Sequence, residues 1–387
     1  MTRPLHDPAK RRRPKSSESF DGGNPRAPAR HSTANGGALT LGSEAVASTS
    51  SFDSVHVRHA HLIQSSVSAG PKKPLHVMKF GGTSVGDASC IERVAAIVWK
   101  ASRTNKVAVV VSAMSGVTNK LIEAADNAGA GNLEESVTIF EDLHKRHQEA
   151  ARTLIRSKDN RRRVTGRLQE LFQEGTHLCK QIVTRQELTP RMSDAISGLG
   201  ERLSAPLVAA ALSEWGLASE AIEATAIIVT NSCHGAADPI MNLTRDRCEA
   251  RLRPLLLRGI VPVVTGFIGA TAEGALTTLG RNSSDHSGTI VGAALNADEV
   301  TIWTDVNGIS TADPKLVPNA RSIPEMSYHD ACTLADSGAK VLHPGALRTA
   351  MQYGIRLTIR NTFAPGHPGT RITLEGASGT ENLPLRP

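Results

Sequence analysis

From residue 75 onward, short runs of apolar residues alternate with longer stretches in which apolar residues recur at helical spacing. The run at 106–112 holds five consecutive apolar residues, four of them Val, a pattern typical of a strand buried on both faces of a parallel sheet. Further strands are predicted before the glycines at 81–82, within 258–269, within 300–309 and at 355–361, where we expect the sheet to end. This alternation predicts an α/β fold.

Helical patterns fill the intervals between these strands. One helix is predicted over 90–100, and residues 120 to about 185 are largely helical and charged, with no chemistry assigned to them. Another helix opens near Gly198 and continues to Trp215, and a short apolar helix is expected over 288–295, after a hairpin around 270–274.

The first 73 residues have a different composition. They are poor in bulky apolar residues and rich in Ser, Pro, Gly, Ala and Arg, so we expect a disordered basic leader or tail. Its Arg and Ser content fits a plastid or mitochondrial transit peptide, but Asp7, Glu18 and Asp21 stand in what should be an acid-poor region. A basic solvated tail, or a start codon assigned too far upstream, remains an alternative. The expected location is therefore the cytoplasm, with the plastid as the alternative.

The net charge of +7 is concentrated in that leader. Residues 1–73 contain 11 Lys and Arg against 5 Asp and Glu, a net charge of +6, which leaves +1 for the rest of the chain. The folded part is thus nearly neutral, and we expect no nucleic-acid partner. No apolar run approaches the roughly 20 residues of a membrane helix, so no membrane partner is expected either. The five cysteines are scattered, which indicates neither a disulfide framework nor a zinc site and fits a reducing compartment.

A glycine pair follows the first strand. Gly81 and Gly82 stand between that strand and a helix, an order that lets the backbone approach a bulky anion at the helix N-terminus. Lys79, at the end of the strand, would direct its ammonium to the same point. The spacing is neither that of a P-loop nor that of a dinucleotide fold. The alternative is a tight turn with a solvated lysine.

Two further polar stretches follow predicted strands. Residues 277–287 contain Arg281, several hydroxyl and amide side chains and Asp285 just before a helix, a combination that suits a carboxylate together with a polyphosphate. Residues 112–119 form a turn of small residues at the carboxyl end of a strand, where open α/β sheets bind ligands. Helix capping by Ser112 or Ser115 is the alternative there.

The stretch Lys79 to Gly86, with the sequence KFGGTSVG, resembles the opening signature of aspartate kinases within the amino acid kinase family. Four later stretches resemble elements of the same family: 198–204, 280–285, 304–315 and 338–344. The resemblance covers about residues 75–372 and implies one catalytic domain, 74–372, built as a three-layer αβα sandwich around a mostly parallel central sheet. Residues 373–387 would be a C-terminal tail, with no regulatory ACT-type domain and hence no feedback inhibition through a module of its own.

The resemblance also implies roles for individual residues. Lys79 and Mg²⁺ would stabilise the transferring phosphoryl group, while Asp285 would orient Lys79. Arg281 would clamp a substrate carboxylate, and Glu201 would pair with the substrate amino group. The same resemblance places Ser112, Thr118, Ser284 and the backbone of Phe267 at the substrate, and Lys79, Gly81, Gly82, Thr304, Asp305, Ser310, Lys315 and Lys340 at the nucleotide.

Three positions depart from the family pattern. Ser283 replaces a glycine, so its Cβ would narrow the approach to the ligand if the position required a positive φ. Ser310 replaces a tyrosine, and Lys315 replaces an arginine, which keeps the charge but loses the fork geometry.

His343 is interpreted as structural, because a carboxylate nucleophile is already ionised near neutral pH and needs no general base.

The resemblance implies ATP-dependent phosphorylation of the side-chain carboxylate of L-aspartate to 4-phospho-L-aspartate, the first step toward lysine, threonine and methionine. ATP and Mg²⁺ are the expected cofactors, no metal-ligating residues are predicted, and a homodimer is implied by resemblance. One alternative is a kinase of another small substrate, such as glutamate, acetylglutamate, carbamate or a nucleoside monophosphate. The other is a non-catalytic regulatory partner that binds ATP and aspartate.

Overall fold

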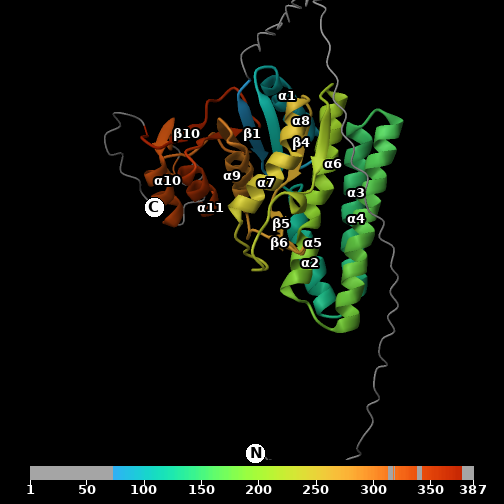
Figure 1. Ribbon diagram of the computed structural model, residues 1–387. Helices are drawn as coiled ribbons and strands as arrows, with labels where there is room; N and C mark the ends of the chain where they lie inside the picture. The colour runs from blue at the N-terminus through green and yellow to red at the C-terminus, as the bar shows by residue number, and fades with distance from the viewer. Residues whose placement is uncertain (1–72, 313–316, 318, 338–341, 377–387) are drawn as a thin grey trace, which may run out of the picture. The chain divides into compact units, whose positions relative to one another are not determined.

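The computed structural model describes residues 73–312, 317, 319–337 and 342–376 (Figure 1). Its centre is an eight-stranded sheet, with neighbouring strands in the order β3-β4-β2-β1-β7-β9-β10-β8. Every pairing in this sheet is parallel except that of β10 with β9. The bounds are β1 Leu75–Phe80, β2 Lys106–Val111, β3 Ser219–Ile222, β4 Val261–Thr265, β7 Glu299–Thr304, β8 Glu325–Ser327, β9 Arg356–Asn361 and β10 Thr370–Thr373. A separate hairpin pairs β5, Ile268–Ala270, with β6, Leu276–Thr278.

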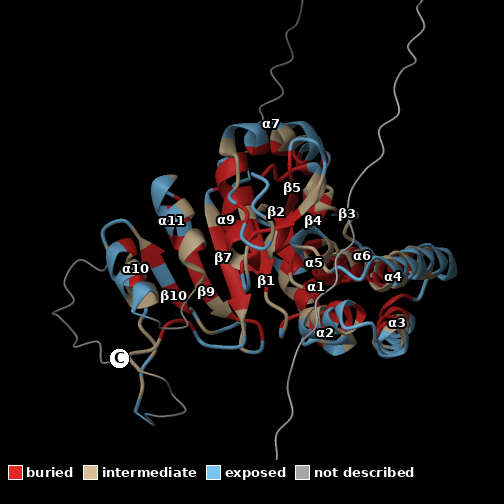
Figure 2. Cartoon of the chain, turned by 90° about the horizontal axis from the view of Figure 1, so that it is seen from below, coloured by how far each residue is buried: buried red, intermediate tan, exposed pale blue. Residues whose placement is uncertain are grey.

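Helices cover both faces of this sheet, so the predicted three-layer α/β fold is confirmed (Figure 2). One face carries α1 Ala88–Ser102, α2 Val117–Gly129, α3 Leu133–Leu154, α4 Lys158–Arg185 and α6 Leu199–Glu214. The other face carries α7 Met241–Arg251, α8 Arg253–Leu257, α9 Ser284–Leu295, α10 Tyr328–Asp336 and α11 Pro344–Gln352. The remaining helices are α5, Pro190–Ser197, and the 3₁₀ turn η1, Ala224–Ala226.

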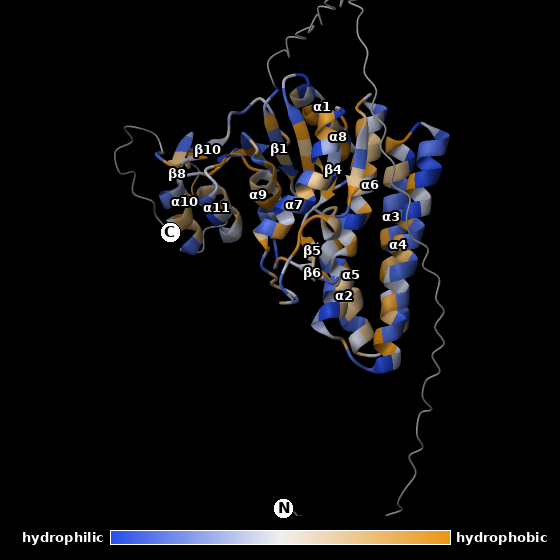
Figure 3. Ribbon diagram, in the orientation of Figure 1, coloured by the Kyte–Doolittle hydropathy of each residue, from blue (hydrophilic) through white to orange (hydrophobic). Residues whose placement is uncertain are grey.

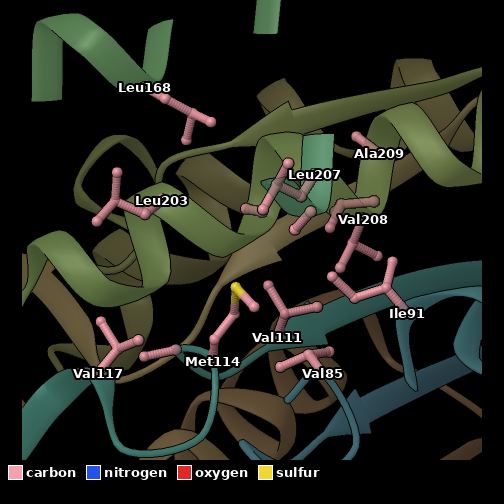
Figure 4. Close-up of a cluster of buried hydrophobic side chains, with 14 of the residues drawn as sticks. Val85, Ile91, Val111, Met114, Val117, Leu168, Leu203, Leu207, Val208 and Ala209 are labelled. Carbon is pink, nitrogen blue, oxygen red and sulfur yellow. The ribbon is translucent and has the colours of Figure 1, made fainter. Parts of the chain in front are cut away.

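The strands supply side chains to both layers because successive residues of a strand point to opposite faces. In β2, Val109 and Val111 join the core beneath α1 and α6, while Ala108 and Val110 join the core beneath α9. Figure 4 shows part of the first core, in which Val111 and Met114 lie against Leu207 and Val208 of α6. This explains why the predicted strand is a continuous apolar run.

Helices α3 and α4 form a long pair beyond α6, with hydrophilic and hydrophobic segments alternating along both (Figure 3). Phe140 of α3 meets Phe172 of α4 edge to face, with ring centroids 6.4 Å apart. Gly175 lets the two helices approach closely, since a Cβ there would overlap the Phe140 ring. Among the described residues, no helix combines the length and apolar character needed to cross a membrane.

The structure corrects two sequence-based expectations about elements and contradicts one of the alternatives. The apolar helix predicted to begin at 288 begins at Ser284, so Asp285 lies inside its first turn. The strand expected to end the sheet, β9, is followed by β10, which pairs with it antiparallel. The N-cap of α2 is Gly116, at φ 79°, so neither Ser112 nor Ser115 caps that helix.

Candidate active site

Most of the predicted site residues that the structure describes lie where β1, β2, β4 and β7 end, at the carboxyl edge of the sheet. Because these strands are parallel neighbours, the loops that follow them emerge side by side. Three backbone hydrogen bonds extend the sheet past the strand ends, from Gly81 N to Trp303 O at 3.0 Å, from Ser112 N to Phe80 O at 3.0 Å and from Gly266 N to Val111 O at 2.8 Å. The glycine turn, the Ser112 turn and the Phe267 loop therefore share one edge.

Lys79 is a charged side chain held inside the protein. Its side chain is 8% exposed and points toward the layer of α9, where its Nζ lies 2.6 Å from Oδ1 of Asp285. Gly288 of α9 makes room for it, because a Cβ at that position would stand 3.0 Å from the Lys79 Cβ. Burying an ion pair costs desolvation free energy, which is offset only by good geometry and by further hydrogen bonds or charged partners.

Glu201 lies in the first turn of α6 and is 3% exposed. Its Oε1 accepts a hydrogen bond from Ala113 N at 3.0 Å, and its Oε2 is buried without a hydrogen-bond partner among the described residues. Burial raises the pKa of Glu201 to about 8, against the opposing effects of the Ala113 bond and the positive charge of Lys79. A buried acceptor of this kind suits a cationic ligand group.

Neither glycine of the pair has a positive φ, and close packing restricts Gly82 but not Gly81, where a Cβ would make only ordinary contacts. A Cβ on Gly82 would lie 3.1 Å from the Ala113 carbonyl oxygen, and one on Gly81 would lie 3.6 Å from Lys79 Nζ. Both glycines are half-buried and so remain partly open to a ligand.

The loop before α9 contains the left-handed residues Gly280, at φ 95°, and Asn282, at φ 61°. Ser283, in contrast, has φ −86° and lies fully buried at the N-cap of α9. The serine therefore avoids the backbone strain that a positive φ would have imposed. Arg281 is exposed and donates to Asn119 Oδ1 at 3.4 Å, beside a hollow of about 570 Å³ along α2.

The remaining substrate-side residues lie around this loop. Ser284 is buried in the first turn of α9, facing Gly266, and Thr118 lies half-buried in the first turn of α2, near Gly200. Phe267 has φ 68°, and both of its backbone polar groups are engaged within the fold. Its N–H donates to Ser287 Oγ at 2.9 Å, and its carbonyl accepts from Leu279 N at 2.9 Å. Substrate contact through this backbone would have to use the second lone pair of the carbonyl.

On the nucleotide side, Thr304 ends β7 and donates to Oδ1 of the exposed Asp305 at 3.2 Å. Ser310 follows in an isolated antiparallel bridge with Ser322. Lys315 and Lys340 lie outside the described residues. Thr304 and Asp305 thus share the carboxyl edge with Lys79, because β7 is the parallel neighbour of β1.

His343 has a local structural contact: it is the N-cap of α11, where its Nδ1 accepts from Gly345 N at 3.2 Å. Its ring also stacks on that of His286, with centroids 5.7 Å apart. Burial lowers the pKa of both imidazoles, that of His286 to about 4. Both rings are therefore neutral near pH 7.

Within the described ranges, no three His, Cys, Asp or Glu side chains converge as a metal site. Mg²⁺ bound to a nucleotide does not need such a group, since it keeps water and phosphate ligands.

Sequence reasoning missed three residues that shape this site. Gly288 makes room for Lys79, Ser287 fixes the Phe267 backbone, and Asp194 binds the segment that leads to Arg281. Ser287 lies at the end of the polar stretch 277–287 and Gly288 directly follows it, so the sequence had already indicated this region. Asp194 carries no such local signal.

Comparison with known proteins adds independent information. The model of the amino acid kinase family matches residues 74–361. The chain is 34% identical over 317 residues to Aspartokinase 2, chloroplastic, of Arabidopsis thaliana, covering 79% of this chain and 56% of the relative. It is 32% identical over 311 residues to Lysine-sensitive aspartokinase 3 of Escherichia coli, covering 80% of this chain and 65% of the relative. The chain thus spans roughly half to two thirds of the length of these curated relatives.

Among solved structures, the fold is similar to that of Escherichia coli aspartokinase III in complex with aspartate and ADP. The TM-score is 0.71 at 30% identity, covering 80% of this chain and 65% of the other. The same enzyme in complex with lysine and aspartate gives a TM-score of 0.69 at 31% identity, covering 80% of this chain and 66% of that one.

Proposed function

The chain belongs to the amino acid kinase family, and from that premise we propose that it is an aspartate kinase. It transfers the γ-phosphoryl group of ATP to the side-chain carboxylate of L-aspartate, giving 4-phospho-L-aspartate and ADP. The observation that carries the proposal is the convergence of three ionisable side chains from three elements: the buried Lys79 of β1, the buried Glu201 of α6 and the partly exposed Asp285 of α9. The relatives named aspartokinase, one of them solved with aspartate and ADP, support the choice of substrates.

The substrate amino group would bind at Glu201. An ammonium placed at Oε2 supplies the donor that this buried oxygen lacks and favours the ionised carboxylate. Arg281 would pair with one substrate carboxylate as a bidentate donor, at the mouth of the site. Ser112, Thr118, Ser284 and the Phe267 carbonyl complete the proposed substrate contacts.

The other substrate carboxylate would act as the nucleophile. One of its oxygens forms a bond to the γ-phosphorus while the bond from that phosphorus to the β,γ-bridging oxygen breaks, and ADP leaves with the electron pair. No proton needs to be removed, because a carboxylate is ionised near pH 7. Catalysis of this kind depends on positioning and on neutralising charge.

Lys79 would place its ammonium against the transferring phosphoryl group, held in direction by Asp285. The half-buried glycines, Gly81 and Gly82, would admit the phosphates, with Thr304, Asp305, Ser310, Lys315 and Lys340 on the nucleotide side. Mg²⁺ would arrive with ATP and neutralise charge on the phosphates, using phosphate and water ligands.

The test is trapping of the acyl phosphate with hydroxylamine, using the full chain, Mg-ATP and either L-aspartate or L-glutamate. Formation of aspartate hydroxamate that is lost in Lys79→Ala would support the proposal. Hydroxamate from glutamate alone would identify another carboxylate kinase. Binding of ATP and aspartate in calorimetry without hydroxamate from either acid would favour a regulatory partner.

A homodimer is proposed from family resemblance, and light scattering of the full chain would contradict it by giving the mass of one chain. Because the relatives include chloroplastic and bacterial enzymes, a fluorescent fusion of the full chain would distinguish plastid from cytoplasmic location.

A further inference from the structure

Asp194 is a buried carboxylate outside the proposed substrate contacts. It lies in α5, is 3% exposed, and accepts hydrogen bonds at both oxygens. Thr278 Oγ1 donates to its Oδ1 at 2.6 Å, and Thr278 N donates to its Oδ2 at 3.2 Å. Gly235 N lies 3.1 and 3.0 Å from the two oxygens, and His234 Nδ1 lies 2.8 Å from Oδ2. We refer to Asp194 with these three partners as the Asp194 junction.

The Asp194 junction joins segments that are distant in the sequence. Its members come from α5, from the loop before α7 and from the last residue of β6. Figure 1 shows α5 beside the β5–β6 hairpin, in agreement with the contacts between α5 and β6. The carbonyl of Thr278 is held as well, since it accepts from Ala237 N at 2.8 Å. The end of β6 is thus fixed by its N–H, its carbonyl and its side chain.

That fixed end is the start of the loop that carries Arg281. Only Leu279 and Gly280 separate Thr278 from Arg281, and α9 begins three residues after it. Arg281 itself is exposed, and its bond to Asn119 is long, at 3.4 Å. Its position therefore depends on what holds the loop at its two ends. On one side these are the Asp194 junction and the Leu279 N–H, which donates to the Phe267 carbonyl, and on the other side it is the packed helix α9.

We propose that Asp194 is a positioning residue for the substrate-carboxylate clamp, acting on Arg281 through Thr278. Asp194 does not contact the substrate. It holds the loop 279–283 in the position from which the Arg281 guanidinium can pair with the substrate carboxylate. The kinetic part of this inference rests on the proposed function, whereas its structural part, the ordering of residues 279–283, does not. Misplacement of a binding group by about 1 Å is enough to cost an enzyme up to about a hundredfold.

Asp194→Asn is the first variant, because an amide turns one acceptor into a donor that faces N–H groups. With aspartate kinase activity established in the wild type, we expect the KM for aspartate to rise at least about tenfold, with the KM for ATP changed less than about twofold. In an Arg281→Ala background the same substitution should add little, since the clamp is already lost. A purely structural role would instead lower activity additively and affect both substrates.

Thr278→Val and Thr278→Ser form a milder matched pair in case Asp194→Asn folds poorly. Valine removes only the 2.6 Å hydroxyl bond, so it should reproduce the change in the KM for aspartate, and serine should restore the wild-type value. Asp298→Asn is the control: that carboxylate accepts from Leu75 N at 2.7 Å at the opposite end of the sheet. It should leave both KM values unchanged.

Hydrogen exchange measured by mass spectrometry tests the inference without activity. In Asp194→Asn and Thr278→Val, peptides covering 279–283 should exchange faster than in the wild type, while those of β1 should not. If the wild type proves inactive, the proposed function fails, and calorimetric binding of aspartate replaces the KM. Unchanged exchange at 279–283 together with an unchanged KM or affinity for aspartate would overturn the inference.

Discussion

At the scale of single residues, Lys79 is a buried cation that pairs with Asp285 within the described part of the chain. Replacing it with alanine would leave Asp285, whose side chain is 17% exposed, without its counter-charge and would remove the proposed phosphoryl contact. We expect Lys79→Ala to lower kcat on the order of a thousandfold, as measured by hydroxamate formation. Lys145→Ala is the control, because that lysine pairs with Asp142 on the surface at 3.3 Å and should leave kcat unchanged. Near-normal turnover by a folded Lys79→Ala protein would refute the role of this lysine.

Glu201 gives a prediction about pH. Burial raises its pKa from the ordinary 4.5 to about 8, so the folded protein without ligand holds a proton there that the unfolded chain has lost. Its contribution to the free energy of unfolding therefore falls as pH rises from about 4.5 to 8.

Because the substrate ammonium binds the ionised form of Glu201, the affinity for aspartate should rise by up to about tenfold per pH unit below pH 8. Calorimetric titration between pH 6 and 8 measures this rise. Glu201→Gln should bind more weakly and lose the pH dependence; a slope that persists in the variant would assign it to another group.

At the scale of elements, helix α9 makes room for the side chain of Lys79 because it carries a glycine, Gly288, at the point of contact. Gly288→Ala should place a Cβ 3.0 Å from the Lys79 Cβ and displace that side chain from Asp285. We expect kcat to fall at least about tenfold although alanine favours a helix. Gly166→Ala in α4 is the matched control, since nothing lies within 4 Å of its Cβ position. It should raise the free energy of unfolding by roughly 0.5–1 kcal/mol without changing kcat. Equal activity of the two variants in the hydroxamate assay would contradict the packing argument.

Elements with strong periodicity could be predicted from the sequence, and short or polar ones could not. The Val-rich run predicted the bounds of β2 to within one residue, because a strand buried on both faces has a continuous run of apolar residues. The four residues of β10 are too few to show a period, and their partner β8 has only three. The start of α9 was placed four residues late, since Ser and Asp are common in turns as well as in first helical turns.

The candidate site was predictable to the extent that its residues stand in continuous motifs. Lys79, Glu201 and Asp285 each belong to one, and the structure brings the three to one edge of the sheet. Asp194 was missed because its partners lie 40 to 84 residues further along the chain. A contact of that separation is set by the tertiary fold and leaves no mark in local spacing.

At the scale of the whole molecule, two buried imidazoles contribute to the response to acid. Burial lowers the pKa of both His147 and His286 from 6.5 to about 4. Between these values the unfolded chain binds protons that the folded protein does not, so stability is lost as pH falls from about 6.5 to 4. Each group contributes on the order of a few kcal/mol. Thermal unfolding across this range should show a Tm that falls with pH.

His147→Leu should flatten that dependence, because its ring lies in the core against Phe172, with centroids 5.6 Å apart, and not at the proposed site. His177→Leu is the control, since that imidazole lies on the open side of α4, hydrogen-bonded to Gln181. If the Tm of His147→Leu falls with pH as steeply as that of the wild type, the loss of stability in acid belongs to other groups.

The order of strands in the sheet has a consequence for the behaviour of the protein at high concentration. Strand edges with unpaired N–H and C=O groups invite other chains to add to them and so promote aggregation. Here the two edge strands are short, with four residues in β3 and three in β8. The long, apolar strands β1 and β2 lie in the interior, paired on both sides. Glu220 on β3 adds a charge that pairs with Arg251. The strand order that places the site at the middle of the sheet therefore also prevents β1 and β2 from pairing with the strands of another copy of the chain.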